Sequence, residues 1–198
     1  MQKLLIASLN KAKVREIKAI LSGISLKVIS MNDFPAIDSA EETGRTFMDN
    51  AILKAKYYAE KFDLLTLAED SGLEVDALDG RPGVYSARYT EGSDSDRVKK
   101  LLDEMREVKK DNRSARFVAA AVIYHPQKGL LFSATGICKG LIASLPTGQN
   151  GFGYDPVFYL PEIDKTSAQL TLEEKNKVSH RAKALIKCLD YLTNYYPL

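Results

Sequence analysis

The sequence predicts an α/β protein with a mixed, twisted sheet flanked by helices. Short apolar runs alternate with amphipathic helical stretches along all 198 residues. Two apolar runs on either side of a turn at 126–129 predict an antiparallel hairpin beside the strands that helices connect. The chain is 45% hydrophobic and 27% charged, which is ordinary for a globular protein. This length predicts one domain, with room for two lobes.

The first part of the chain predicts two strands and two helices. Residues 3–7 form a short apolar strand, and helical spacing runs from the N-cap candidate Asn10 to about Leu21. Residues 26–29 are consistent with a second strand. Thr46 can cap a second helix. The apolar residues that share one face of this helix are Phe47, Ala51, Ala55, Tyr58 and Phe62.

The middle of the chain predicts four further strands and a helix. An apolar strand at 64–68 ends at the acidic segment 69–72, and alternating residues at 73–77 predict a separate, half-buried strand. A third helix covers 94–108. The hairpin strands then occupy 115–138, with the turn at their centre.

The last part of the chain predicts a loop, a short strand and helical structure. The loop at 146–156 is rich in glycine and proline, and a strand follows at 157–159. Thr171 and Glu174 have the spacing of a capping box. The helical region that begins there runs to about Tyr191.

Composition excludes several classes of function. A net charge of +2 argues against a coat for nucleic acid or for a membrane surface. The longest apolar stretch, 117–124, is about a third of a bilayer span, and the amino terminus lacks a signal-peptide layout. Cys138 and Cys188 are too few for a disulfide framework or a zinc quartet. We expect a cytoplasmic protein with neither nucleic acid nor membrane as partner.

The first strand-to-helix turn, Ser8–Lys13, has the makings of an anion site. Backbone N–H groups at a helix start, with Lys13 one turn in, suit a phosphate. An ordinary capped turn with surface lysines is the alternative reading. The turn is neither a Walker loop nor a dinucleotide fingerprint.

Carboxylates in two separate segments suit a magnesium ion. Glu41 and Glu42 lie in a loop, and Asp70 follows an apolar strand and precedes Ser71. Ligands bind at strand ends in open α/β sheets, and Mg²⁺ takes one or two carboxylates together with water and phosphate oxygens. A solvated turn is the plainer reading for Glu41 and Glu42.

Two later segments suit recognition of a flat, polar ligand. In 150–156, glycines on either side of Phe152 let the backbone approach a ligand on which the ring stacks, and Asp155 can bond a base edge. In 175–181, a helical wheel places His180 opposite the apolar face. Either His180 is exposed, or the helix restarts with Ser179 as its N-cap and directs His180 and its neighbour into a cleft.

Together these segments resemble the inosine triphosphate pyrophosphatase family, the Ham1-type nucleoside triphosphate pyrophosphatases. The resemblance covers essentially the whole chain. The last two segments match the family patterns G-F-G-Y-D-P and S-H-R outright. The matching segments are, in order, Ser8–Glu16, Glu41–Ala55, Ala68–Arg88, Gly151–Pro156 and Ser179–Arg181.

The resemblance implies a single domain over 1–198, with two lobes and a substrate cleft between them. It implies Mg²⁺-dependent hydrolysis of ITP, dITP and XTP to the monophosphate and pyrophosphate. This reaction would remove deaminated purines from the nucleotide pool. The resemblance also implies a homodimer. Asp70 would be catalytic, and Glu41, Glu42 and Asp70 would hold the metal. The residues implied to bind the nucleotide are Ser8, Asn10, Lys13, Lys54, Ser71, Phe152, Gly153, Tyr154, Asp155, Lys175, His180 and Arg181.

Three residues depart from the family pattern. Leu9 replaces a glycine, Glu69 replaces the first aspartate of D-D-S-G, and Gln169 replaces a glutamate. These departures bear on rate and fine specificity. Two other functions remain open at this point: a Maf-type nucleotide pyrophosphatase of different base preference, and a catalytically weak nucleotide-binding paralogue.

Overall fold

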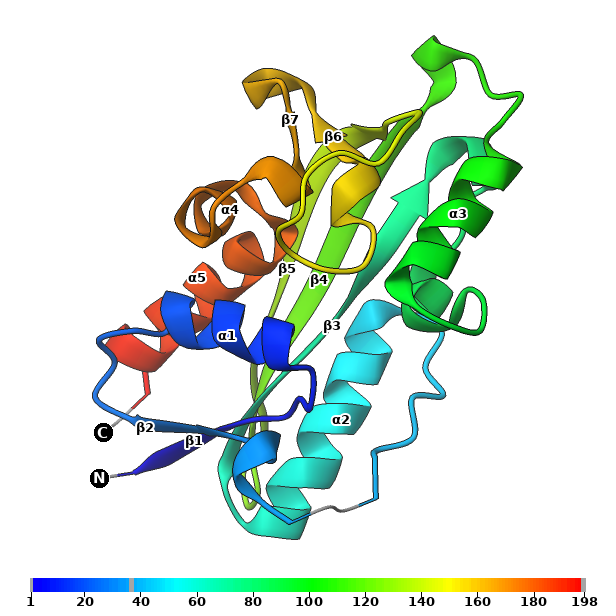
Figure 1. Ribbon diagram of the computed structural model, residues 1–198. Coiled ribbons are helices and arrows are strands. Elements are labelled where there is room, and N and C mark those ends of the chain that lie inside the picture. Colours follow the sequence, from blue (N-terminus) through cyan, green and yellow to red (C-terminus); the bar gives the residue numbers. More distant parts are fainter. Residues whose placement is uncertain (1, 36–37, 197–198) are drawn as a thin grey trace. The chain divides into compact units, whose positions relative to one another are not determined.

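The computed structural model describes residues 2–35 and 38–196 (Figure 1). The chain divides into two compact units. Unit 1 comprises residues 1–70, 119–136 and 180–198, and unit 2 comprises residues 71–118 and 137–179. Each unit has its own cluster of buried apolar side chains.

The strands form one sheet in the order β2-β1-β3-β4-β5-β6-β7. β1 is parallel to both β2 and β3, whereas β6 is antiparallel to β5 and β7. The sheet is therefore mixed, as the sequence predicted. The strands are β1 (Lys3–Ile6), β2 (Lys27–Ser30), β3 (Leu65–Val75), β4 (Ser114–His125), β5 (Gly129–Ile142), β6 (Phe158–Leu160) and β7 (Lys165–Thr166).

In unit 1, helices cover both faces of the strands. Leu4 and Ile6 pack in a core with α1 (Lys11–Ile20) and α5 (His180–Asn194), two helices that lie side by side (Figure 1). Leu5 faces the other way along β1 and is also fully buried. The buried face of α2 (Phe47–Phe62) covers that side (Figure 1).

In unit 2, α3 and residues of the strands enclose the second core. α3 (Asp94–Glu104) contributes Val98 and Leu101, and the rings of Phe117 and Phe158 meet at 4.5 Å between centroids. The short helix α4 (Leu172–Val178) follows β7 and begins at a Thr171 capping box, as predicted.

The acidic segment predicted at a strand end lies instead inside a strand. β3 runs unbroken through residues 65–75, so the two strands predicted at 64–68 and 73–77 are one. Glu69 is 3% exposed, and its neighbour Asp70 is also buried. Charged side chains are costly to bury in a strand unless they have partners. Lys13 and Arg181 supply those partners, and the strand continues through the charge.

The final helical region consists of two helices. α4 ends at Val178, Ser179 adopts an extended backbone, and α5 begins at His180. The predicted restart of the helix after Ser179 is therefore confirmed, whereas the direction of His180 and Arg181 into a cleft stays a prediction. His180 is 4% exposed, so the reading that leaves it on the surface is wrong.

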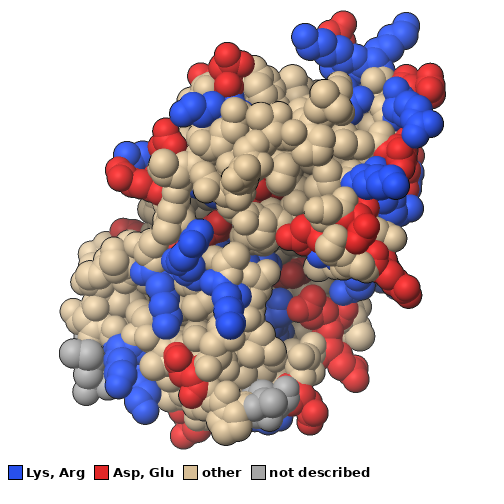
Figure 2. All heavy atoms as spheres, viewed as in Figure 1, with Lys and Arg blue, Asp and Glu red and all other residues tan. Residues whose placement is uncertain are grey.

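Charged side chains of both signs are interspersed on the face shown in Figure 2. Cys138 and Cys188 are both buried free thiols. Within residues 2–35 and 38–196, no helix is both long and apolar enough to cross a membrane.

Candidate active site

In unit 1, a buried ion-pair network joins α1, β3 and α5. The guanidinium of Arg181 is almost fully buried; its Nη1 bonds Oε2 of Glu16, and its Nη2 lies 3.1 Å from Oε1 of Glu69. The other carboxylate oxygen of Glu69 lies 3.0 Å from Nζ of Lys13. Buried charges are tolerated only when they are paired, so these four side chains fix one another's positions.

A second cluster in unit 1 surrounds the ammonium group of Lys54 on α2. Its Nζ lies 2.7 Å from Oε1 of Glu42 and 3.7 Å from Oδ1 of Asp70. The neighbouring Glu41 is exposed. Of the two loop carboxylates that the sequence offered, the structure therefore brings Glu42 to Asp70.

Local hydrogen bonds hold the loop that carries Glu42. The N–H of Gly44 donates to Oδ1 of Asn50, a fully buried side chain of α2, at 2.8 Å. Thr46 caps α2 and exchanges reciprocal bonds with Asp49. The loop is thus tied to the helix that supplies Lys54.

Burial and neighbouring charges shift the pKa values of this cluster. Burial raises the pKa of Asp70, and the nearby ammonium groups of Lys54 and Lys13 offset this only in part. For Lys54, burial acts to lower the pKa, but the carboxylates of Asp70 and Glu42 outweigh it and hold the pKa above its ordinary value. A carboxyl group whose pKa is raised in this way is a better proton acceptor once ionised.

The turn before α1 is capped by the side chain predicted to cap it. Oδ1 of Asn10 accepts bonds from the N–H groups of Ala12 at 3.0 Å and Lys13 at 3.1 Å, and Ser8 Oγ accepts from Asn10 N–H at 3.2 Å. The cap thus uses two of the first-turn N–H groups that were predicted to bind an anion. Two ammonium groups belong to this turn: that of Lys11 is exposed, and that of Lys13 pairs with Glu69.

In unit 2, Phe152, Asp155 and Lys175 form a compact group. Oδ2 of Asp155 accepts from Phe152 N–H at 2.9 Å and from Lys175 Nζ at 2.5 Å. The same Nζ lies 5.0 Å from the centroid of the Phe152 ring. Asp155 is 3% exposed, so it holds this group together from within the unit.

Three other predicted residues of unit 2 have varied surroundings. Tyr154 is buried in the second core and its hydroxyl donates to the carbonyl oxygen of Ser86 at 3.0 Å. Gly153 has φ +62°, and its N–H donates to Oδ2 of Asp94 at 2.6 Å. Ser71 is half-buried in β3, directly after Asp70.

The start of α5 depends on a glycine of β5. A Cβ atom on Gly136 would lie 2.1 Å from the carbonyl oxygen of His180 and 2.5 Å from the backbone nitrogen of Ala184. The helix can approach the strand this closely because residue 136 has no side chain. Gly136 therefore helps to set the position of His180 and Arg181.

Sequence reasoning missed two carboxylates as parts of the site. Glu16 holds Arg181, and Asp94 binds the peptide N–H of Gly153. Glu16 ends the first segment of the resemblance, and it lies beside the apolar positions Val14 and Ile17 on α1, which could have marked it as buried. No local signal in the sequence connects Asp94 to the loop at 146–156.

These features define an α/β protein with a mixed sheet, with paired lysines and carboxylates in unit 1 and an aromatic–lysine group in unit 2. The sequence model of the Ham1 family matches residues 4–191, and the chain belongs to that family.

Curated relatives and solved structures agree with this assignment. The chain is 48% identical over 193 residues to a dITP/XTP pyrophosphatase of Halalkalibacterium halodurans, covering 96% of this chain and 98% of the relative. It is 45% identical to that of Escherichia coli K12, covering 98% and 100%. The structure of a HAM1 protein from Coxiella burnetii has a TM-score of 0.87 at 38% identity and covers 98% of this chain and 99% of its own. The Staphylococcus aureus Ham1 protein has a TM-score of 0.84 at 40% identity, covering 96% and 98%.

Proposed function

We propose that this protein hydrolyses ITP, dITP and XTP to the nucleoside monophosphate and pyrophosphate, and so removes deaminated purine nucleotides from the nucleotide pool. The observation that carries the proposal is the Lys54 cluster, in which one ammonium group lies beside the carboxylates of Glu42 and Asp70. The near full-length similarity of this chain to relatives named dITP/XTP pyrophosphatase supports the same reaction.

Two lysines of unit 1 would bind the triphosphate. Lys13 and Lys54 are each held by a carboxylate, Glu69 and Glu42 respectively. Their side chains are only 17% and 13% exposed, so few rotamers are open to them and little side-chain entropy is lost on binding. Lys175, also predicted to bind nucleotide, belongs to the Phe152 group in unit 2.

The donor set of unit 1 fits a magnesium ion. Within the described ranges no three histidine, cysteine, aspartate or glutamate side chains form a ready metal site. Mg²⁺ does not need one, because it uses one or two carboxylates together with water and substrate phosphate oxygens. Asp70 and Glu42 would hold it, and when bound it would neutralise phosphate charge and lower the pKa of a water.

Asp70 is the residue proposed to act on the attacking water. Its carboxylate would orient the water and accept its proton as the bond between the α- and β-phosphates breaks. Lys54, whose own pKa is held high, stays charged and would face the developing negative charge. Glu16 and Glu69 act further back, because they fix Arg181 and Lys13 rather than meet the substrate.

The choice of base would follow from hydrogen-bond donors near the Phe152 ring. Hypoxanthine and xanthine present an acceptor at O6, where adenine presents an amine. The ammonium of Lys175 lies beside the Phe152 ring, on which a base would stack. As a hydrogen-bond donor, it would favour a base that presents an acceptor. His180 and Arg181 remain predicted base contacts. A buried donor left facing a donor costs about 1–3 kcal/mol, which corresponds to about 5- to 150-fold in rate.

The test is pyrophosphate release from ITP, dITP, XTP, ATP and GTP at equal concentration, with and without Mg²⁺, with the products separated by chromatography. We expect the three deaminated substrates to give monophosphate and pyrophosphate about 10- to 100-fold faster than ATP, and only with Mg²⁺. Guanine shares the O6 acceptor, so slower turnover of GTP requires in addition that the site exclude its 2-amino group. Equal turnover of ATP, or release of inorganic phosphate in place of pyrophosphate, contradicts the proposal.

We also propose that the enzyme is a cytoplasmic homodimer, as the family resemblance implies. Light scattering coupled to size exclusion should then give twice the chain mass of 22.0 kDa. A mass equal to that of one chain at micromolar concentration contradicts the dimer.

A further inference from the structure

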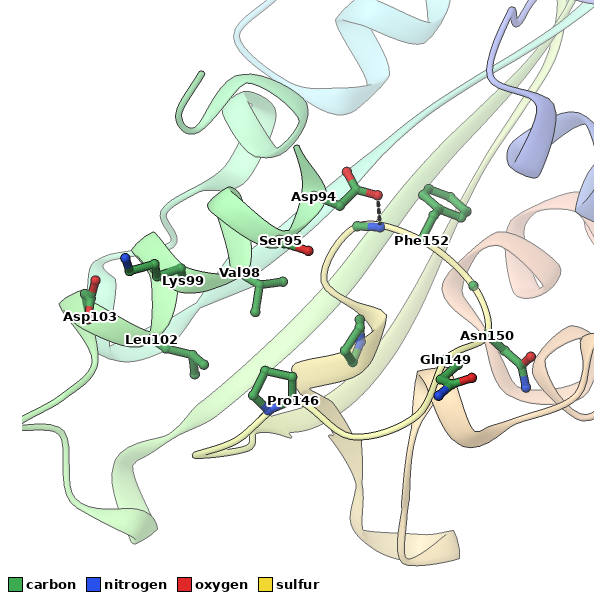
Figure 3. Close-up of a pocket in the computed structure, with 13 residues that line it drawn as sticks. Asp94, Ser95, Val98, Lys99, Leu102, Asp103, Pro146, Gln149, Asn150 and Phe152 are labelled. Carbon is green, nitrogen blue, oxygen red and sulfur yellow. Dashed lines mark hydrogen bonds between the residues drawn. The ribbon is translucent and has the colours of Figure 1, made fainter. Parts of the chain in front are cut away.

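A pocket separates α3 from the loop at 146–153 in unit 2 (Figure 3). Its volume is about 430 Å³, and Val98 and Leu102 of α3 line it together with Pro146 of the loop. Because this space is open, side-chain packing does not press the loop against the helix along the pocket. The first half of the loop is held by bonds from the Thr147, Gln149 and Asn150 N–H groups to the carbonyl oxygens of residues 156 and 168. The conformation at 151–153 therefore depends on the hydrogen bonds that carboxylates make there.

One such bond crosses from the helix to the loop. Oδ2 of Asp94, in the first turn of α3, accepts from the N–H of Gly153 at 2.6 Å (dashed line in Figure 3). Its other oxygen pairs with Arg97, one turn further along α3. A carboxylate bond to a peptide N–H is charge-assisted and stronger than a neutral one.

This bond fixes the peptide plane that follows Phe152. The plane that precedes Phe152 is fixed by Asp155, which accepts from the Phe152 N–H at 2.9 Å. Gly151 and Gly153, with φ of +76° and +62°, flank the phenylalanine, and glycines restrict the chain least. Two carboxylates from different elements thus set the direction of the Phe152 side chain where the sequence itself does not.

We propose that Asp94 is a positioning residue for Phe152 and thereby sets the enzyme's affinity for the nucleotide base. The proposal rests on the function proposed above. Asp94 does not touch the substrate; it holds the peptide that directs the stacking ring. Its loss should weaken binding of the base and leave the phosphate chemistry of unit 1 unchanged.

The test compares KM and kcat for ITP among matched variants. Asp94→Ala should raise KM about tenfold and change kcat less than about twofold, because ground-state and transition-state binding are lost together. Asp94→Asn keeps an acceptor for the Gly153 N–H, so its KM should stay within about threefold of wild type. The Asp94 side chain is 47% exposed, so truncation removes no core contact.

Asp96→Ala is the control for damage to α3. Asp96 lies in the same first turn and caps the helix with Ser93, but its carboxylate bonds Ser93 rather than the loop. This variant should lower the melting temperature at least as much as Asp94→Ala and leave KM unchanged. If Asp94 had only a structural role, KM would change in the same way in Asp94→Ala and Asp96→Ala.

A double-mutant cycle with Phe152→Ala decides the question. If Asp94 acts through the ring, Asp94→Ala should have almost no further effect on KM once the ring is gone. Hydrogen exchange in the nucleotide-free protein should also show faster exchange of the 152–154 amides in Asp94→Ala, and not in Asp96→Ala.

Two results overturn the proposal: an unchanged KM in Asp94→Ala, or an equal rise in KM with and without Phe152. Failure of the proposed function is recognised separately, because a wild-type protein that does not turn over ITP, dITP or XTP shows it before any variant is compared. Active wild type with additive mutational effects overturns the role of Asp94 alone.

Discussion

The Nζ atom of Lys13 lies 3.0 Å from Oε2 of Glu69, and this contact ties the first turn of α1 to the interior of β3. Glu69 stands where the family pattern has an aspartate. Its side chain is 1% exposed, and its other oxygen lies 3.1 Å from Arg181. Both carboxylate oxygens of Glu69 are thus paired, one with Lys13 near the start of the chain and the other with Arg181 near its end.

Glu69→Gln should destabilise the protein by about 3 kcal/mol, because it leaves Lys13 and Arg181 short of a buried counter-charge. Glu173→Gln is the matched control: Glu173 pairs with Lys177 on the surface, where the side chains are 82% and 68% exposed. That change should cost less than about 0.5 kcal/mol. Urea unfolding at pH 7 measures both, and equal losses would contradict the buried network.

Asp70→Asn should raise stability near neutral pH while it lowers activity. The folded-state pKa of Asp70 lies above its ordinary value of 3.8, mainly because of burial. Ionisation of Asp70 is therefore less favourable in the folded protein than in the unfolded chain, and stability is lost as pH rises through the raised pKa. Melting temperatures of wild type and Asp70→Asn should diverge from pH 4 upward and then run parallel. A variant less stable than wild type at pH 8 would refute this.

Gly136→Ala should displace the start of α5. The new Cβ would meet the carbonyl of His180 at 2.1 Å, and overpacking of this kind costs about 1–3 kcal/mol or more. We expect a lower melting temperature and a loss of ITP turnover, since His180 and Arg181 move with the helix. Thr135→Ala, at the exposed neighbouring position, is the control. Wild-type behaviour of Gly136→Ala would show that the strand and helix are not held at this distance.

The two thiols should be unreactive in the folded protein. Cys138 and Cys188 are both buried, and burial raises the pKa of Cys188 to about 12. The thiolate is the reactive form, so a disulfide reagent at pH 8 should modify neither residue until denaturant is added, and then both. Rapid modification of one thiol under native conditions would place it at the surface.

Much of the fold could be predicted because its signals are local. Asn10, Thr46 and Thr171 cap the helices that the sequence assigned to them, and the bond from each cap spans only two or three residues. The hairpin of β4 and β5 was likewise predictable from two apolar runs around one turn. Such patterns need no knowledge of distant segments.

The interior of the site depended on pairs far apart in sequence. Arg181 and Glu16 are separated by 165 positions, and no local sequence pattern predicts their bond. The sequence predicted that a strand ends at the acidic segment 69–72, and this was wrong for the same reason. A buried glutamate fits inside a strand only because the distant Lys13 and Arg181 neutralise it. Which of Glu41 and Glu42 meets Lys54 also depended on how the loop folds against α2.

The central claim is that Asp70, beside Lys54 and Glu42, carries out the pyrophosphate-releasing reaction. The most direct measurement is Mg²⁺-dependent pyrophosphate release from ITP by Asp70→Asn, with Glu60→Gln, an exposed carboxylate of α2, as control. We predict that Asp70→Asn loses about 10²- to 10⁴-fold in kcat, the usual contribution of a general base, while the control keeps wild-type turnover. Near wild-type turnover by a folded Asp70→Asn would contradict the account.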